Sequence, residues 1–262
     1  MSDAPAGPNI RPSRAADAAN QEAAYAQQAR GRDWSSHPPY RAPAYRSTLT
    51  RGPAQALVPL PASETPSSGP VFGHTHVRAI DADLTRNALT ADTTNAAPLG
   101  ERIILTGAVI DERARPQPGV LIELWQANAA GRYIHTDDQH NAPLDPHFFG
   151  GGRCVSDAQG RYRFTTIKPG AYPWGNHTNA WRPAHIHLSL FGPTIASRLI
   201  TQVYFPGDPL LDHDPIYLAT PLAARPRLVA SFTLDETIEG HALGYRFDIV
   251  LRGSDATAFE TA

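Results

Sequence analysis

Three side chains in one short stretch have the types and spacing of metal ligands. His185 and His187 are two residues apart on a predicted strand, so their imidazoles point to the same face. Tyr172 lies just before that strand, in a turn restricted by Pro169 and Pro173, and such a turn fixes where the phenol points. Two imidazoles and a phenol indicate a metal site with harder ligands than those of a zinc site.

The histidine pair has an ordinary alternative. A lone H-x-H is as readily a pair of half-exposed histidines on a strand, and the chain holds a second one, His74 and His76. No tyrosine-bearing turn precedes that second pair, so we interpret it as structural or solvent-facing. Tyr133, in a Gly-containing loop after the strand that ends at Trp125, would by itself be ordinary packing.

Taken together, Tyr133, Tyr172, His185 and His187 would suit ferric iron. A phenol with a pKa near ~10 ionises at neutral pH only if something strongly favours the anion, and a bound trivalent metal does so. This set differs from the two histidines and one carboxylate that hold ferrous iron. Structural zinc would require cysteines, and Cys154 is the only one.

The elements around these residues predict an all-β fold. From about residue 101 the chain shows short β-type runs separated by turn residues, without interleaved helices, which is typical of a β-sandwich of mostly antiparallel strands. In the strand with the two histidines, Ile186, Leu188 and Leu190 face the other way and would enter the core. The expected strands cover residues 103–110, 120–125, 162–167, 185–190, 199–205, 227–232 and 245–251.

Residues 1–70 have a composition of their own. Residues 13–30 are rich in Ala and Gln and predict a short helix with Ser13 as its N-cap. Residues 36–70 are crowded with prolines and cannot form a core, so they serve as a linker or dock in extended form on another surface. We therefore expect an N-terminal extension over residues 1–70, helical and then Pro-rich, and a β-sandwich domain over residues 71–262.

Composition excludes several kinds of partner. The 262 residues carry a formal net charge of −2, which gives no reason to expect nucleic acid or an anionic membrane. No apolar run approaches the ~20 residues that would span a bilayer, and no secretory signal is apparent. The single cysteine, Cys154, excludes an intrachain disulfide and fits a reducing compartment. We expect a cytoplasmic protein.

The candidate ligands belong to a series of motifs in fixed order. These are Trp-Gln-Ala-Asn at 125–128, Gly-Arg-Tyr at 131–133, Ala-Pro-Leu-Asp-Pro at 142–146, Gly-Arg-Cys at 152–154, Ile-Lys-Pro-Gly-Ala-Tyr-Pro-Trp at 167–174, Trp-Arg-Pro-Ala-His-Ile-His at 181–187, Leu-Ile-Thr-Gln at 199–202 and Tyr-Arg-Phe-Asp-Ile-Val-Leu-Arg-Gly at 245–253. The series closely resembles the intradiol ring-cleaving dioxygenases, and within them the iron-binding β subunits that act on protocatechuate. The resemblance runs from about residue 41 to residue 260.

The resemblance implies a role for each matching residue. It implies that Tyr133, Tyr172, His185 and His187 bind a non-haem Fe(III) ion, and that Tyr172 leaves the metal when the catechol arrives. The other implied site residues are Arg182 and Gln202, beside the substrate and the oxygen-derived intermediate, and Tyr45, Trp125, Trp174 and Ile216, which line the pocket. Gly175 departs from the family pattern, where an arginine commonly follows Pro-Trp, and this puts one charge near the pocket mouth in doubt.

The implied reaction joins protocatechuate and O₂ to give 3-carboxy-cis,cis-muconate, in the β-ketoadipate pathway of aromatic degradation. The resemblance also implies a partner, a homologous α subunit without iron ligands, with the active site at the interface. Residues 36–70 would lie along that partner.

Two other interpretations remain. Catechol and hydroxyquinol 1,2-dioxygenases resemble the chain, but they are homodimers with a helical N-terminal region, and here only one short helix precedes the Pro-rich segment. A transthyretin-like β-sandwich that binds sugars or proteins without metal would share residues 118–124 and 156–164. Only the two tyrosines and two histidines separate that binding module from the enzyme.

Overall fold

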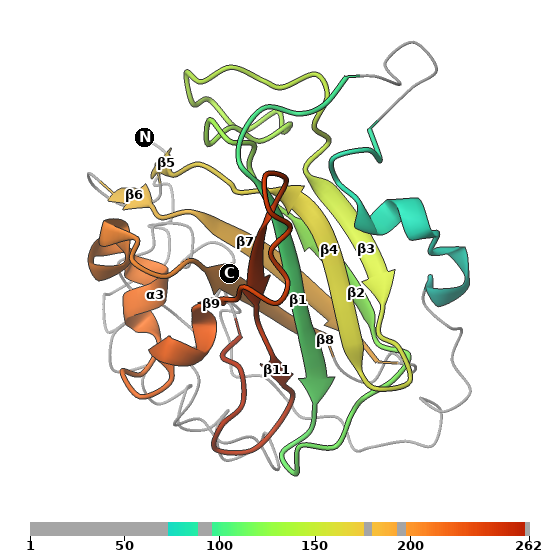
Figure 1. The fold of residues 1–262 in the computed structure, drawn as a ribbon. Helices are drawn as coiled ribbons and strands as arrows, with labels where there is room; N and C mark the ends of the chain where they lie inside the picture. Colours follow the sequence, from blue (N-terminus) through green and yellow to red (C-terminus); the bar gives the residue numbers. More distant parts are fainter. Residues whose placement is uncertain (1–72, 89–95, 176–179, 193–197, 260–262) are drawn as a thin grey trace, which may run out of the picture.

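The computed structural model describes residues 73–88, 96–175, 180–192 and 198–259. Its strands form two facing sheets and a small separate hairpin (Figure 1). The predicted β-sandwich is therefore confirmed. The predicted helix at 13–30 and the Pro-rich segment at 36–70 lie outside the described residues, and the domain boundary at residue 70 stays a prediction.

The first sheet has five strands in a mixed arrangement. Strand β1 (Arg102–Ile110) runs antiparallel to β4 (Arg161–Ile167) on one side and parallel to β10 (Leu243–Arg246) and β11 (Ile249–Val250) on the other. Strand β9 (Ser231–Phe232) pairs with the outer edge of β10.

The second sheet is antiparallel and carries the candidate site. Its order is β3 (Gly151–Val155), β2 (Leu121–Trp125), β7 (His185–Phe191) and β8 (Arg198–Tyr204), so β7 has a neighbour on each side. The separate hairpin pairs β5 (Tyr172–Trp174) with β6 (Ala180–Arg182). Figure 1 shows this hairpin and helix α3 (Pro215–Ala219) on the same side of the fold, the side of β7.

The core lies between the two sheets. On β7, Ile186, Leu188 and Leu190 are buried in one cluster with Leu105 of β1 and Phe164 of β4. Burying one such aliphatic or aromatic side chain contributes roughly 1.5–3 kcal/mol. This face of β7 is therefore fixed by the core, and the opposite face is available for the site.

Two predicted strands differ from the structure. Residues 227–232 form only β9, because the 3₁₀-helix η7 (Arg225–Leu228) precedes it with Pro226 near its start, where no amide hydrogen is available for a ladder. The predicted strand 245–251 is divided between β10 and β11. Strand β3, which begins with two glycines, was not predicted.

The break between β10 and β11 has a local cause. Phe247 donates its amide to the Thr106 carbonyl at 2.8 Å, and its own carbonyl accepts from Tyr162 Oη at 2.6 Å. That carbonyl passes so close to Gly107 that a Cβ there would lie 1.8 Å from it. Only glycine at 107 permits this approach. Because the Phe247 carbonyl bonds to the Tyr162 hydroxyl, the ladder stops there and resumes at Ile249.

The described helices are short. They are η3 (His74–His76), η4 (Ala79–Ala82), η6 (Pro209–His213), η7 and α3. In the part of the chain that the structure describes, none has the length and apolarity needed to cross a membrane.

The fold predicts an inert thiol at Cys154. The side chain is buried on β3, and burial raises the pKa of the thiol to about 12. We expect no reaction with Ellman's reagent at pH 8 in the native protein, because only about one thiol in 10⁴ would be ionised. After unfolding in guanidinium chloride, one thiol per chain should react. Rapid reaction of the native protein would contradict this burial.

Candidate metal centre

Strand β7 places His185 and His187 on the face opposite the core. Both imidazoles are buried. His187 lies opposite Trp125 of β2, and the two rings stack with centroids 4.8 Å apart and planes within 4°. His187 therefore has a paired strand on each side, whereas His185, the first residue of β7, pairs with Tyr204 of β8. The indole fixes the plane of the His187 ring.

The tautomer of His185 follows from one hydrogen bond. Its Nδ1 lies 2.7 Å from the Pro183 carbonyl oxygen, which can only accept, so Nδ1 carries the proton and Nε2 presents its lone pair. Burial, followed by the charges of Arg182 and His187, lowers the pKa of His185 well below its usual value, so the ring is neutral. Its Nε2 lies 3.2 Å from His187 Nε2 and 3.3 Å from Tyr172 Oη.

Two glycines bring the tyrosines to this point. Gly131 has φ +75°, and a Cβ there would lie 2.1 Å from the Ala171 carbonyl oxygen. A Cβ on Gly170 would lie 2.4 Å from the Ala129 carbonyl oxygen. The loop that carries Tyr133 can therefore touch the backbone before Tyr172 only because both contacts are made by glycine.

Asn128 ties the same two segments together. Its carbonyl accepts from the amides of Gly131 and Gly170, and its side-chain Oδ1 accepts from the amides of Ala130 and Arg132. These bonds fix the loop that precedes Tyr133.

The Tyr133 ring lies against the other candidate ligands. Its backbone amide donates to Asp138 Oδ2 at 2.7 Å. The ring packs edge-on against Tyr172 with centroids 5.5 Å apart, and its centroid is 6.5 Å from that of His187. The structure thus brings Tyr133, Tyr172, His185 and His187 together, although they come from three separate segments.

The donors gathered here fit a hard, highly charged metal ion. Among the described residues, no group of three or more His, Cys, Asp or Glu could hold a metal ion. A metal at this point must therefore draw on the tyrosine oxygens as well as the lone pair at His185 Nε2. Phenolate oxygens prefer a trivalent ion over zinc, so Fe(III) fits the residues present.

Arg182 lies beside the cluster in a buried network. Its Nε and Nη2 donate to the two oxygens of Asp214, each at 3.0 Å, and both side chains are almost fully buried. Burial would lower the pKa of Arg182, but Tyr204 and Asp214 raise it well above its usual value. The guanidinium is therefore a permanent positive charge inside the site.

The same guanidinium sets the orientation of Gln202. Arg182 Nη2 donates to Gln202 Oε1, which also accepts from Tyr204 Oη at 2.8 Å. Since arginine cannot accept, Oε1 must face it, and the amide nitrogen points the other way. Gln202 Nε2 is buried and has no hydrogen-bond partner in the structure. Opposite Gln202 in the sheet is His187.

Of the remaining predicted pocket residues, the structure describes Trp174 and Ile216. Arg182 lies 5.6 Å from the centroid of the Trp174 ring, on the β5–β6 hairpin. Ile216 follows the N-cap of α3, and its amide donates to Asp214 Oδ1. Tyr45 lies outside the described residues. At Gly175 an added Cβ would meet no atom within 4 Å, so the missing arginine is not a matter of space.

The second histidine pair is not part of the cluster. His74 and His76 form η3, and His76 is exposed. A Cβ added at the adjacent Gly73 would lie 3.6 Å from Leu121 Cδ2. Leu121 is the first residue of β2 and Trp125 is the last. The pair therefore sits at the other end of this strand from His187.

Two residues of the site were not predicted. Asp214 pairs with Arg182, and Tyr204 contacts both Arg182 and Gln202. A weak signal was present for each. Asp214 precedes a proline, as a helix N-cap often does, and Tyr204 is two residues from Gln202 on one strand.

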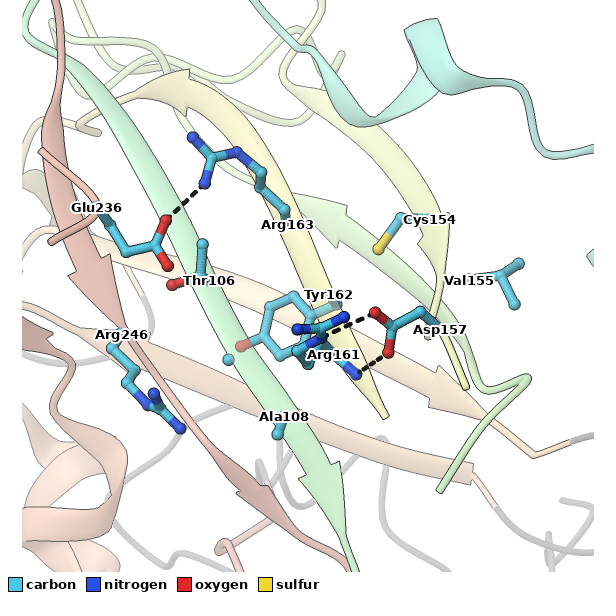
Figure 2. A pocket seen from close by; sticks show the side chains of 11 residues that line it. Thr106, Ala108, Cys154, Val155, Asp157, Arg161, Tyr162, Arg163, Glu236 and Arg246 are labelled. Carbon is cyan, nitrogen blue, oxygen red and sulfur yellow. Dashed lines mark hydrogen bonds and ion pairs between the residues drawn. The ribbon is translucent and has the colours of Figure 1, made fainter. Parts of the chain in front are cut away.

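A hollow of about 440 Å³ lies elsewhere, against β1, β3 and β4. Figure 2 shows two of its arginines at carboxylates, Arg161 at Asp157 and Arg163 at Glu236. The third, Arg246, pairs with Asp248. None of the candidate ligands lines it, and its paired, exposed charges offer no reactive group.

With this geometry described, the comparisons with known proteins identify the class. A family model described as "Dioxygenase" matches residues 67–253, and one described as "Protocatechuate 3,4-dioxygenase beta subunit N terminal" matches residues 31–63. Because the first covers more than half of the chain, the chain belongs to the intradiol ring-cleaving dioxygenase family. The resemblance seen in the sequence motifs is confirmed.

Within that family the chain is 61% identical over 229 residues to the protocatechuate 3,4-dioxygenase beta chain of Burkholderia cepacia, covering 87% of this chain and 96% of that one. It is 34% identical to the chlorocatechol 1,2-dioxygenase of Rhodococcus opacus, over 44% of this chain and 48% of the relative. A solved 3-chlorocatechol 1,2-dioxygenase from Rhodococcus opacus 1CP shares 24% identity, with 66% of each chain covered and a TM-score of 0.49.

The close contact at Gly131 can be separated from its backbone strain. Gly131→Ala should lower the free energy of unfolding by about 1–3 kcal/mol more than Gly240→Ala, because overpacking against Ala171 adds to the cost of a positive φ. Gly240 has φ +68° but no atom within 4 Å of an added Cβ, so it carries the backbone cost alone. Urea denaturation of both variants measures this, and equal losses would rule out the close contact.

Proposed function

We propose that this chain is the catalytic β subunit of an intradiol dioxygenase that cleaves protocatechuate with O₂ to 3-carboxy-cis,cis-muconate. The observation that carries the proposal is that three candidate ligand atoms converge beside the Tyr133 ring. His185 Nε2 lies 3.3 Å from Tyr172 Oη and 3.2 Å from His187 Nε2. Both atoms of O₂ enter the product, so the reaction needs no external reductant.

The choice of protocatechuate over catechol or hydroxyquinol rests on similarity. The relative that is 61% identical along nearly its whole length is a protocatechuate 3,4-dioxygenase beta chain. The relatives that act on chlorocatechol and hydroxyquinol match only about half of this chain or less, at 34% and 30% identity. Membership of an enzyme family also removes the support for a metal-free binding module.

Tyr133, Tyr172, His185 and His187 would hold a non-haem Fe(III) ion. When bound, this ion supplies a Lewis acid that acidifies the two catechol hydroxyls and draws electron density from the ring. Two anionic oxygens and two neutral nitrogens leave a net single positive charge on such a site, which favours a further anionic ligand such as a catecholate.

Tyr172 is the ligand best placed to move aside for substrate. It lies on the three-residue strand β5, whose partner in the hairpin is β6, whereas the histidines belong to β7, a seven-residue strand between β2 and β8. Once free of the metal, Tyr172 Oη could accept a proton, and a catechol hydroxyl could supply it.

The remaining side chains act on the substrate. The buried charge of Arg182 would stabilise negative charge that develops on the ring, and Gln202 Nε2 offers a free hydrogen-bond donor beside it. Trp125, Trp174 and Ile216 would bound the pocket. From the family resemblance, Tyr45 would complete the pocket wall.

We also propose a homologous α subunit as partner. Ile134, Leu144 and Trp181 are large apolar side chains that are about half exposed or more, and the first two lie in the loop after Tyr133. The Trp181 ring packs edge-on against His140 of the same loop, so this exposed surface borders the site. Residues 36–70 would lie along the partner there. A fully active protein made of this chain alone would count against the partner.

Iron content gives a direct prediction for the ligands. Tyr133→Phe removes one phenolate oxygen with little change in shape, so the purified complex should hold much less iron than the wild type. His74→Ala, in the other histidine pair, should retain full iron. Elemental analysis of both complexes measures this, and wild-type iron in Tyr133→Phe would remove Tyr133 from the ligand set.

The activity itself is tested by product analysis. The chain produced together with its α partner should consume one O₂ per protocatechuate and release 3-carboxy-cis,cis-muconate, identified by mass spectrometry with ¹⁸O₂. Catechol and hydroxyquinol should be poorer substrates. Cleavage outside the two hydroxyl-bearing carbons, or a preference for catechol, would contradict the proposal.

A further inference from the structure

Asp214 is a buried carboxylate to which neither the sequence motifs nor the comparisons assign a role. It lies between η6 and α3, 32 residues from Arg182 in the chain, and it has no exposed surface. A charge buried this completely persists only when it is paired and hydrogen-bonded.

The hydrogen bonds of Asp214 divide between two tasks. Oδ1 accepts from Arg182 Nε and from the amide of Ile216, both at 3.0 Å, and Oδ2 accepts from Arg182 Nη2 at 3.0 Å. One carboxylate therefore binds the guanidinium through two parallel bonds and also caps α3. The plane of the guanidinium is fixed by this fork.

The fork has a consequence for Gln202. Arg182 Nη2, held by Asp214, also donates to Gln202 Oε1 and to Tyr204 Oη. As long as the guanidinium keeps this plane, Gln202 must turn its oxygen towards it and its unpartnered Nε2 away. The other partner of Gln202 Oε1 is the Tyr204 hydroxyl, which can accept as well as donate. If the guanidinium rotates, the Gln202 amide is therefore no longer held in this orientation.

We propose that Asp214 is a positioning residue for the reaction: it fixes Arg182, and through Arg182 it directs the free amide donor of Gln202 into the site. The inference rests on the proposed function, since it assumes that the charge of Arg182 and the donor at Gln202 Nε2 act on the substrate. In the structure the Asp214 side chain bonds to Arg182 and to the Ile216 amide, and to none of the four candidate ligands.

The variant Asp214→Asn separates positioning from capping. The asparagine oxygen can still accept from the Ile216 amide, so α3 keeps its cap. Its NH₂ group, however, faces Arg182 Nη2, donor against donor, and the second bond of the fork is lost. The matched control is Asp212→Asn, the same change two residues earlier at an exposed position.

We expect Asp214→Asn to lower kcat by about 10- to 100-fold, the usual effect of removing an outer partner of a catalytic group. Iron content, by elemental analysis of the complex with the α partner, should equal that of the wild type, and KM for protocatechuate should stay near its wild-type value. Asp212→Asn should match the wild type in all three. If kcat per iron in Asp214→Asn equals that of the control while the melting temperature falls, Asp214 is only structural and the proposal is wrong.

If Asp214→Asn does not fold, a double variant can still test the proposal. In Arg182→Gln/Asp214→Asn no buried charge is left unpaired, so this chain should fold. If Asp214 acts through Arg182, kcat per iron of the double variant should equal that of Arg182→Gln alone. A further drop of the size expected for the single change would overturn the proposal.

Failure of this inference is distinct from failure of the proposed function. If the wild-type complex cleaves no protocatechuate, the function is wrong. If the wild type is active and Asp214→Asn is equally active per iron, only the positioning role is wrong.

Discussion

The alternation of side chains along β7 is the constraint on which the rest of the structure depends. One face of this strand gives Ile186 and Leu188 to the core, and the other gives His185 and His187 to the site. A slip of one residue in its pairing would exchange the two faces, placing the imidazoles in the apolar core and the core side chains in the site. The packing of the core therefore also fixes the positions of the two histidines, so these ligands are in place before a metal binds.

The tyrosines reach the histidines from outside this sheet, and backbone contacts bring them there. The approach of Gly131 to Ala171 joins the Tyr133 loop to the segment before Tyr172. Behind the histidines, Arg182 and Asp214 form a buried ion pair, and removing one partner of such a pair typically costs about 3–5 kcal/mol. Apolar residues of similar size would often be as stable, so stability alone does not account for this pair.

Much of this was predictable from the sequence, for physical reasons. Period-two alternation predicts the strand with His185 and His187. Five other expected strands also appear within a few residues of their bounds, apart from the break at Phe247. The prediction of a strand over 227–232 was wrong for its first residues, because Pro226 and the 3₁₀-helix η7 override the β-type composition there. Asp214 could not be found, since its significance lies in a contact with Arg182 across 32 residues, which no local pattern encodes.

The central claim is that Tyr133, Tyr172, His185 and His187 bind one ferric ion, and anomalous diffraction tests it most directly. Crystals of the aerobically purified complex would be measured on both sides of the iron absorption edge. We predict a single strong anomalous peak per chain, within bonding distance of both tyrosine oxygens and both histidine Nε2 atoms. A site without iron, or an iron peak that none of the tyrosine oxygens reaches, would contradict the account.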